Sequence, residues 1–297
     1  MSKAHLNLTD QHKIRIGTCA WTFEDWRGYF YPSDLPESQW LEFYANHFPS
    51  VEVDSTFYAA PLAATIRRWI EVTPATFRFT CKLPREITHA YRLRDCAAEL
   101  NLFFQAIEPL APKLQVILIQ LLPSFAPNDG KAALSKFLHQ LPRDFRFAIE
   151  FRHAGWHRPH IIRLLEKHRI CWVWADTTPL NERNLAPFEF LPCTTDFLYL
   201  RLLGDYATKY GVDGEDLHRY EKLLWKREAA LHSWSLKIER HLSEVRSVWA
   251  FASNHFEGFA PETCQRLAER LGFNLPLPSK IEEALPEQER SQLDLQL

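Results

Sequence analysis

Eight short apolar stretches recur along the chain, separated by longer polar segments. Each stretch is rich in β-branched and aromatic residues and is bounded by polar or proline-containing sequence, a pattern typical of buried β-strands. The predicted strands are Ile14–Thr18, Val51–Thr56, Phe77–Lys82, Gln115–Leu121, Phe145–Phe151, Cys171–Thr177, Phe197–Leu203 and Val248–Asn254.

Helical patterns lie between most of these strands. In one of them Leu100, Phe103 and Ile107 fall on a single stripe at helical spacing. The predicted helices are Glu37–His47, Leu62–Val72, Arg94–Glu108, Lys131–Gln140, Pro159–Lys167, Ser235–Glu244 and Pro261–Arg270. Strands that alternate with helices predict a parallel sheet, and closing it as a barrel removes both of its edges. We therefore expect an α/β fold of the TIM-type (β/α)8 barrel class.

The chain has 297 residues, and one such barrel takes about 250 residues before insertions. We therefore expect a single domain over residues 1–297, with a barrel core of about 14–272. The acidic, proline-containing segment 273–297 is expected to form a tail outside the barrel.

Two connections depart from the repeat. The segment Thr178–Asp196 follows the sixth strand, contains three prolines and has no clear helical pattern. The longer segment Asp205–Trp234 follows the seventh strand, and its part Leu217–Leu231 is predicted to be helical and charged. Long loops after barrel strands lie on the catalytic face, so Asp205–Trp234 is a candidate lid.

Composition narrows the class of protein. The formal net charge is −2, without a block of basic residues, which disfavours a protein that coats nucleic acid. The six cysteines form no C-x-x-C pair, so we expect reduced thiols and no structural zinc. The segment Met1–Lys13 lacks an apolar core, and the apolar stretch Leu114–Leu122 is too short to span a bilayer. These features predict a cytoplasmic protein that does not enter membranes.

Polar residues stand at the ends of nearly all the predicted strands. Side chains alternate along a strand, so one phase points into the barrel. Choosing the phase that turns the terminal polar residue inward predicts a ring of Glu52, Asp54, Thr80, Lys82, Gln120, Glu150, Arg152, Asp176, Tyr199, Arg201 and Asn254. A barrel core built only for stability would carry branched apolar residues there.

The charges of this ring indicate the kind of ligand. Four carboxylates contribute −4 and three cations contribute +3. A divalent metal site usually concentrates carboxylates and histidines without cations among them, so we expect no metal. Arginine side chains instead favour an anion such as phosphate or carboxylate. No glycine-rich nucleotide motif is present, and we predict no cofactor.

Individual roles follow from these positions. The candidate catalytic residues are Glu52, Lys82, Glu150 and Asp176, and the candidate substrate-binding residues are Trp21, Asp54, Tyr58, Arg152, His153, Arg201 and Asn254. Two further histidines, His89 and His255, follow strands and are candidate acid–base groups. The alternative is a structural salt-bridge network that plugs the barrel. A ring built for function would tolerate Glu150→Gln thermally, whereas a structural network would not.

Several motifs resemble the YecE-like family, the domain of unknown function 72. They are Gly17-Thr-Cys-Ala-Trp21, Trp26-x-Gly28-x-Phe30-Tyr31-Pro32, Val51-Glu-Val-Asp-Ser-Thr-Phe-Tyr58, Phe79-x-x-Lys82-x-Pro84, Ile87-Thr88-His89, Glu150-Phe-Arg-His153 with Trp156, and Asn254 with Glu257-Gly258 and Ala260-Pro261. The resemblance spans about Ile14 to Gly272 and implies a TIM-type barrel without an established activity. The chain departs from the family pattern at Cys19-Ala20, where Ser-Gly is common. It also departs at Leu203-Gly204 and Ser253-Asn254.

Three functions remain open at this point. The first is a metal-independent enzyme, a hydrolase or lyase, that acts on a small anionic or sugar-like substrate at the carboxyl-terminal mouth of the barrel. The second is a nucleic-acid-processing or nucleic-acid-binding barrel similar to abasic-site endonucleases, which rests on fold analogy. The third is a barrel that binds a small molecule without acting on it.

Overall fold

Eight parallel strands close into a barrel in the computed structural model, which describes residues 8–177, 191–204 and 219–278. Each strand pairs with its neighbours in sequence order, and β1 pairs with β8 to complete the ring. The strands are β1 (Ile14–Cys19), β2 (Ser50–Val53), β3 (Arg78–Lys82), β4 (Leu114–Gln120), β5 (Phe147–Glu150), β6 (Ile170–Thr177), β7 (Phe197–Gly204) and β8 (Ser247–Ala252). The predicted TIM-type barrel is confirmed.

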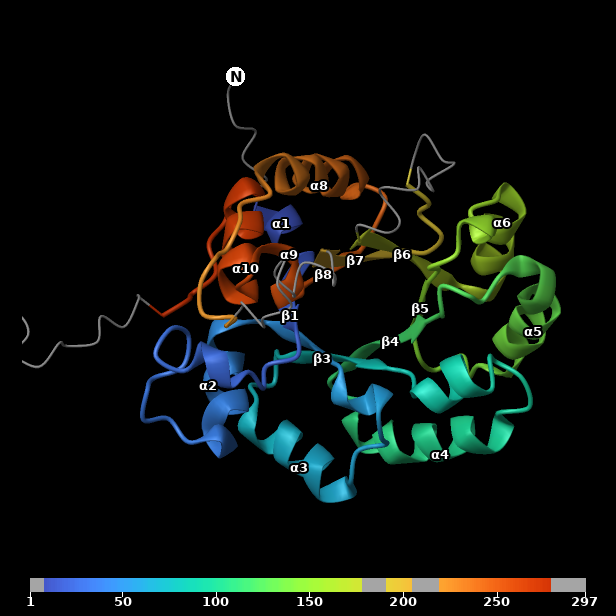
Figure 1. The fold of residues 1–297 in the computed structure, drawn as a ribbon, viewed down its shortest axis with the longest axis horizontal. Coiled ribbons are helices and arrows are strands. Elements are labelled where there is room, and N and C mark those ends of the chain that lie inside the picture. Colours follow the sequence, from blue (N-terminus) through green and yellow to red (C-terminus); the bar gives the residue numbers. More distant parts are fainter. Residues whose placement is uncertain (1–7, 178–190, 205–218, 279–297) are drawn as a thin grey trace, which may run out of the picture.

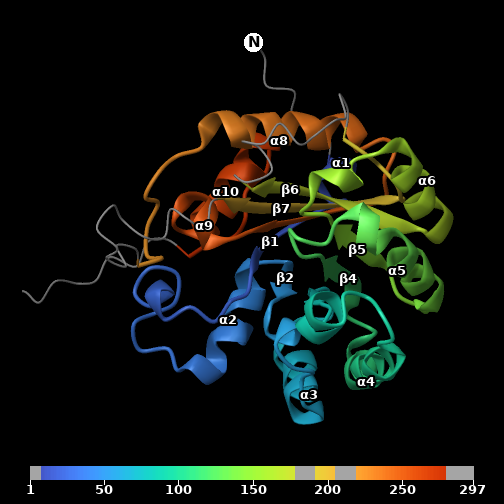
Figure 2. The ribbon, with the colours of Figure 1, turned by 45° about the vertical axis from the view of Figure 1, so that its right-hand side comes forward.

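Helices surround this barrel (Figures 1 and 2). They are α1 (Leu8–Gln11), α2 (Trp40–His47), α3 (Ala63–Val72), α4 (Ala97–Ile107), α5 (Pro127–Gln140), α6 (Pro159–His168), α8 (Glu228–His241), α9 (Asn254–Glu257) and α10 (Ala260–Arg270). Single turns of tighter or wider helix occupy Glu24–Trp26, Glu37–Gln39, Ser55–Phe57, Glu86–Ala90, Glu108–Leu110 and Ala154–Trp156. None of the helices in the described ranges is both long enough and apolar enough to cross a membrane.

The helix expected within Leu217–Leu231 is wrong over residues 219–227 and correct over residues 228–231. Residues 219–227 are turns and irregular backbone, and α8 begins only at Glu228. The backbone amides of Leu224 and Arg227 donate to Glu257 of α9 and not to carbonyl oxygens of their own segment, as they would in a helix. These two hydrogen bonds hold the segment against α9. Residues 178–190 of the first long connection and residues 205–218 of the candidate lid lie outside the described residues.

Two layers of apolar side chains follow from the alternation of the strands. One set, which includes Val116, Val173 and Phe251, fills the interior of the barrel. The other set, which includes Ile117 and Trp174, packs beneath the surrounding helices. Apolar side chains fill the barrel interior toward the amino ends of the strands. The inward charged residues therefore gather at the carboxyl ends. All six cysteines are free thiols.

Ala20 directly after β1 has a left-handed backbone, with φ of 64°. Its amide donates to the carbonyl oxygen of Glu52 at 2.8 Å, which holds the turn in this conformation. A residue with a Cβ is strained there, and glycine is not. We expect Ala20→Gly to raise the free energy of unfolding by about 0.5–1 kcal/mol in urea denaturation.

A matched control for this substitution is Ala132→Gly, on the exposed side of α5. Because Ala132 is helical, glycine should lower the free energy of unfolding there by roughly 1 kcal/mol. Equal destabilisation by both substitutions would contradict the strain at Ala20.

Candidate functional site

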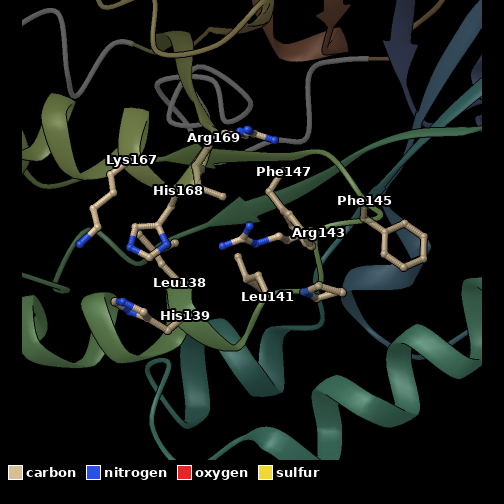
Figure 3. A pocket seen from close by; sticks show the side chains of 11 residues that line it. Leu138, His139, Leu141, Arg143, Phe145, Phe147, Lys167, His168 and Arg169 are labelled. Carbon is tan, nitrogen blue, oxygen red and sulfur yellow. The ribbon is translucent and has the colours of Figure 1, made fainter.

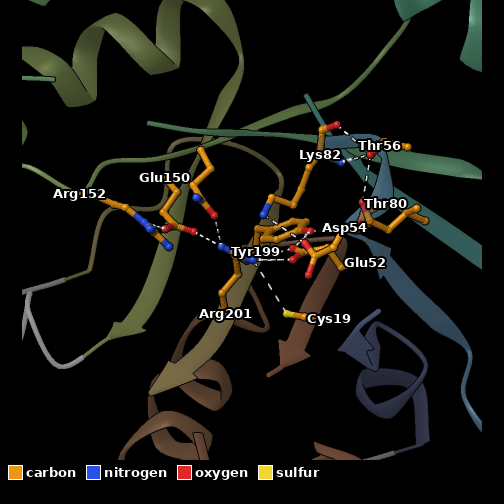
Figure 4. Close-up of polar contacts among 12 residues, drawn as sticks. Cys19, Glu52, Asp54, Thr56, Thr80, Lys82, Glu150, Arg152, Tyr199 and Arg201 are labelled. Carbon is orange, nitrogen blue, oxygen red and sulfur yellow. Dashed lines mark hydrogen bonds and ion pairs between the residues drawn. The ribbon is translucent and has the colours of Figure 1, made fainter. Parts of the chain in front are cut away.

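Arg201 lies at the centre of the inward polar residues and is 1% exposed (Figure 4). Its guanidinium projects from β7 and donates to both carboxylate oxygens of Glu52 on β2, at 2.6–3.1 Å. It also donates to Gln120 on β4 at 3.0 Å and forms an ion pair with Glu150 on β5. Burial alone would lower the pKa of Arg201, but the adjacent carboxylates raise it well above its usual range. One buried cation therefore joins four strands.

A chain of hydroxyl groups extends this network on the side of Glu52. The phenol of Tyr199 donates to Glu52 at 2.6 Å and lies 2.9 Å from the hydroxyl of Thr80. Burial, together with Glu52, raises the pKa of Tyr199 well above its usual range, so the phenol keeps its proton. The thiol of Cys19 contacts Arg201 at 4.0 Å, and burial likewise raises its pKa well above the ordinary value. These groups hold the carboxylate of Glu52 in place.

Glu150 binds two arginines at once. Its second oxygen accepts from Nε of Arg152 at 2.6 Å, opposite the ion pair with Arg201. Burial would raise the pKa of Glu150, but these two cations outweigh it and lower the pKa to about 2. Glu150 is therefore ionised at any physiological pH. It is poorly suited to donate a proton and well suited to position Arg152.

Arg152 keeps unused hydrogen-bonding capacity. Its side chain is 20% exposed, and among the described residues only Glu150 pairs with it, through Nε. A guanidinium carries five N–H donors in a planar fork. The terminal nitrogens of Arg152 are thus available to an anion at the mouth of the barrel.

Lys82 forms a second, more open pair at the end of β3. Its ammonium lies 3.1 Å from the carboxylate of Asp54, whose side chain is 33% exposed. The same ammonium stands 4.5 Å from the centre of the Phe57 ring. The hydroxyl of Thr56 bonds to both backbone groups of Lys82, which fixes the ends of β2 and β3 relative to each other. This lysine also has donors to spare.

His89 stands beside this lysine in the turn after β3. Its ring lies 5.0 Å from that of Phe57, and its Nδ1 is 2.8 Å from the hydroxyl of Thr88. Burial lowers the pKa of His89 to about 4, and the positive charges of Arg152, Lys82 and Arg85 add to the effect. The imidazole is therefore neutral at pH 7, within electrostatic reach of cations from two strands.

Tyr58 is the expected ligand-facing aromatic that remains accessible. It is 72% exposed and meets Phe57 edge-on at 5.3 Å. Trp21 is not accessible in this way. It is only 8% exposed and packs edge-on against Trp69 of α3. The expectation that Trp21 faces a ligand is wrong because β1 ends with that ring turned toward the helices.

Asp176 does not join the ring. Val173 points into the barrel, whereas Trp174 points outward, and Asp176 shares the outward face. The indole nitrogen of Trp234 on α8 donates to its carboxylate at 2.5 Å. The predicted inward direction of Asp176 is therefore wrong, because the phase of β6 is set by its apolar residues. Its carboxylate joins the outer side of β6 to α8.

Asn254 is also turned away from the ring. Its side-chain oxygen accepts from the amide of Ala260, at the start of α10, at 2.9 Å. It also accepts from the indole of Trp26 at 3.3 Å. The predicted inward direction of Asn254 is wrong, and this side chain instead joins the first loop to the last helix. His153 accepts from the amide of Gly155 at 3.0 Å and caps a short turn.

His255 contacts the phenol of Tyr220, with 3.3 Å between the oxygen and Nδ1.

Of the predicted ring, the structure joins Glu52, Glu150 and Arg201 directly, with Lys82, Asp54 and Arg152 at the same end of the barrel.

Without Asp176, the charges of this group balance. Three carboxylates on Glu52, Asp54 and Glu150 face three cations on Lys82, Arg152 and Arg201. Within the described part of the chain, no three histidine, cysteine, aspartate or glutamate side chains gather in a way that could hold a metal ion. The mouth therefore presents paired charges, of which Arg152 and Lys82 have donors left for a ligand.

Sequence reasoning missed two contributors, Cys19 and Thr56. Cys19 could have been found from alternation, because Gly17 and Cys19 share the inward phase of β1. Thr56 acts through its hydroxyl from a turn after β2, where no periodicity predicts direction.

Comparisons with known proteins place these features in a family. The family model described as "Protein of unknown function DUF72" matches residues 15–289. The protein YunF of Bacillus subtilis is 30% identical over 271 residues, which cover 87% of this chain and 94% of YunF. YecE of Escherichia coli K12 is 36% identical over 146 residues, and this match spans only 48% of the chain and 53% of YecE.

Solved structures agree with this assignment. A DUF72 family protein from Thermotoga maritima is 28% identical with a TM-score of 0.67, covering 86% of this chain and 97% of its own. A DUF72 family protein from Enterococcus faecalis has a TM-score of 0.69 at 20% identity, covering 90% and 98%, and supports the fold alone. The chain therefore belongs to the DUF72 family.

Proposed function

We propose that the mouth of the barrel binds a small anionic molecule, of the size of a sugar phosphate or sugar acid, and acts on it without a metal. The observation that carries this proposal is the unused donor capacity of Arg152 and Lys82 around the neutral His89. Guanidinium and ammonium groups recognise carboxylate and phosphate oxygens through charge-assisted hydrogen bonds.

The spacing of the strands supports the size of the ligand. Lys82 ends β3 and Arg152 follows β5, with β4 between them. Adjacent strands lie about 4.8 Å apart, so the two strands are separated by roughly 10 Å. A single anionic group held by one cation would leave the rest of a sugar-sized molecule over Gln120. The exposed ring of Tyr58 offers an apolar face beside this position.

Proton transfer falls to Asp54 and His89 in this proposal. Glu150 and Glu52 are fully buried and bound to arginines, so they position the cations. Asp54 is partly exposed, and His89 is a neutral imidazole that can accept a proton. Two proton acceptors beside an anion-binding arginine fit hydrolysis or elimination, in which the group that takes a proton from water or from the substrate then returns it to the leaving group. Arg201, used fully by Glu52, Gln120 and Glu150, supports the site and does not hold the substrate.

Arg152→Gln tests the proposal. The wild-type protein is titrated calorimetrically with a panel of sugar phosphates and sugar acids, and turnover is followed for each compound that binds. Because Arg152→Gln removes the guanidinium fork and leaves the buried Arg201–Glu52 pair, we expect affinity to fall roughly tenfold to a hundredfold. A bound anion should also raise the pKa of His89 from about 4, so the contribution of His89 should tighten binding as pH falls toward 4.

The matched control is Arg240→Gln, an exposed arginine of α8 far in sequence from the mouth. It should bind the same compounds as the wild type. Equal affinities for Arg152→Gln and the wild type would overturn the proposal. Binding of a DNA oligonucleotide that weakens steeply with salt would favour a nucleic-acid barrel instead. Binding without turnover of any compound would favour the non-catalytic alternative.

A further inference from the structure

A second group of basic side chains lies at the opposite end of the barrel, where β5 and β6 begin (Figure 3). A cavity of about 230 Å3 opens there between the last turns of α5 and α6. Five basic residues line it together with apolar side chains. Arg169 is one of them, and the other four are His139, Arg143, Lys167 and His168. We name these four residues and the space between them the basic cavity.

No carboxylate lines the basic cavity. Asp144 is next to Arg143 in the chain but lines a different depression, beside Arg146. Within the described ranges, neither Arg143 nor Lys167 forms an ion pair with an acidic side chain. The mouth of the barrel differs in this respect, because all its cations are matched by carboxylates. The basic cavity carries uncompensated positive charge.

The two imidazoles of the cavity are in direct contact. The rings of His139 and His168 meet edge-on with 4.4 Å between their centres. Nδ1 of His139 lies 2.7 Å from the carbonyl oxygen of Ser135, so its Nε2 is left to face outward. Nε2 of His168 is buried and has no hydrogen-bond partner in the described structure. A buried polar atom without a partner is costly and calls for an explanation.

The guanidinium of Arg143 points toward the ring of His168, across the space that separates them (Figure 3). Burial lowers the pKa of His168, and His139, Lys167 and Arg143 lower it further, whereas an interaction with the backbone of Leu138 acts in the opposite direction. Arg169 also lines the cavity, but its guanidinium points away from Arg143 (Figure 3). Four positive or protonatable groups from two helices and the segment before β5 thus line one small cavity, with Lys167 and Arg143 on opposite sides of the His168 ring (Figure 3).

The helix dipole explains only part of this arrangement. Cations are favoured in the last turn of a helix, which accounts for His139 in α5 and for Lys167 and His168 in α6. It does not account for Arg143, which follows the end of α5 and still turns toward His168. A ligand of opposite charge accounts for all four residues.

We propose that the basic cavity is a second ligand site, separate from the mouth of the barrel, that binds a small phosphate-bearing anion through Arg143, Lys167 and His139. A phosphate dianion matches two fixed cations and one imidazole. Its oxygens can accept from Arg143 and Lys167, and from Nε2 of His139 when that ring is protonated on both nitrogens. The volume suits a phosphate group or a pyrophosphate and excludes a large ligand. The anion also offsets the repulsion that opposes protonation of His168.

The test uses the full-length protein with inorganic phosphate and inorganic pyrophosphate as probes. Binding is measured by calorimetry, and the imidazole Cε1–H signals of His139 and His168 are followed by NMR. We expect saturable binding that shifts both signals and raises the pKa of His168. Arg143→Gln should weaken this binding roughly tenfold, and Lys167→Gln should weaken it in the same direction.

Two control variants separate this site from other causes. Arg163→Gln removes an exposed arginine of α6 that does not line the cavity, and its affinity should match the wild type. Arg152→Gln alters the mouth and should leave the signals of His139 and His168 responsive. The proposal is overturned if the probes do not shift these two signals. It is also overturned if they shift only His89, or if folded Arg143→Gln and Lys167→Gln both bind like the wild type.

Discussion

Replacing Arg201 with methionine should lower the free energy of unfolding by about 3–5 kcal/mol at neutral pH. Methionine fills much of the same volume but leaves two fully buried carboxylates, Glu52 and Glu150, without their shared cation. Burying an unpaired charge is far more costly than losing a well-placed ion pair. Urea denaturation followed by tryptophan fluorescence measures the loss. Tyr199 alone cannot replace the arginine, because its phenol contacts only one oxygen of Glu52.

A triple variant identifies the cause of this loss. Combining Arg201→Met with Glu52→Gln and Glu150→Gln removes all three charges, so part of the lost stability should return. A triple variant that is no more stable than Arg201→Met alone would show that packing, and not uncompensated charge, sets the cost.

Glu150→Gln should be destabilising in a way that depends on pH. The folded-state pKa of Glu150 is about 2, against an ordinary value of 4.5. A depressed pKa adds stability that is fully present above the unfolded value and is lost as pH falls toward the folded value. This shift corresponds to roughly 3 kcal/mol above pH 5, on the order of one large core mutation. The wild type should lose this contribution as pH falls from about 4.5 to about 2. At the lower end of this range the two proteins should have similar free energies of unfolding.

The measurement is urea denaturation of both proteins across this range of pH. Glu24→Gln is the control, because Glu24 pairs with Arg27 at an exposed site and should change stability little. If Glu150→Gln is as stable as the wild type at pH 7, the ion pairs with Arg152 and Arg201 do not stabilise the fold. From the sequence, a ring built for function predicted that Glu150→Gln would not lower thermal stability. The two ion pairs of Glu150 lead us to expect that it does.

Much of the barrel and of its polar end follows from the sequence. Strand alternation placed Glu52, Lys82, Glu150 and Arg201 on the inner face, because their strands carry apolar residues in the opposite phase. Parallel strands in sequence order then bring these side chains to one end. The eight strands and the helical pattern between them therefore predict which of these side chains share one end of the barrel with Arg201, but not which of them pair with it.

The phase of every strand was chosen by turning its terminal polar residue inward. This rule failed for two of the predicted residues, Asp176 and Asn254. Asp176 was predicted to point inward because it is charged. Trp172 and Trp174 lie on the outer face of β6, and alternation places Asp176 on the same outer face. The prediction for Asn254 failed for another reason: β8 ends at Ala252 and Asn254 begins α9, where the alternation of a strand no longer applies. An indole that can donate to a carboxylate from an adjoining helix is a tertiary contact, and no periodicity in the sequence predicts it.

The position of Arg201 along the chain bears on how the protein folds. Its partners Glu52 and Glu150 precede it by 149 and 51 residues. A chain that has been synthesised only through β5 carries both carboxylates but no buried cation to hold them together. Burial of either carboxylate before β7 arrives would leave a charge unpaired, so half-barrels are poor resting states. We therefore expect barrel closure to be concerted and the native interior to form only when nearly all the strands are present.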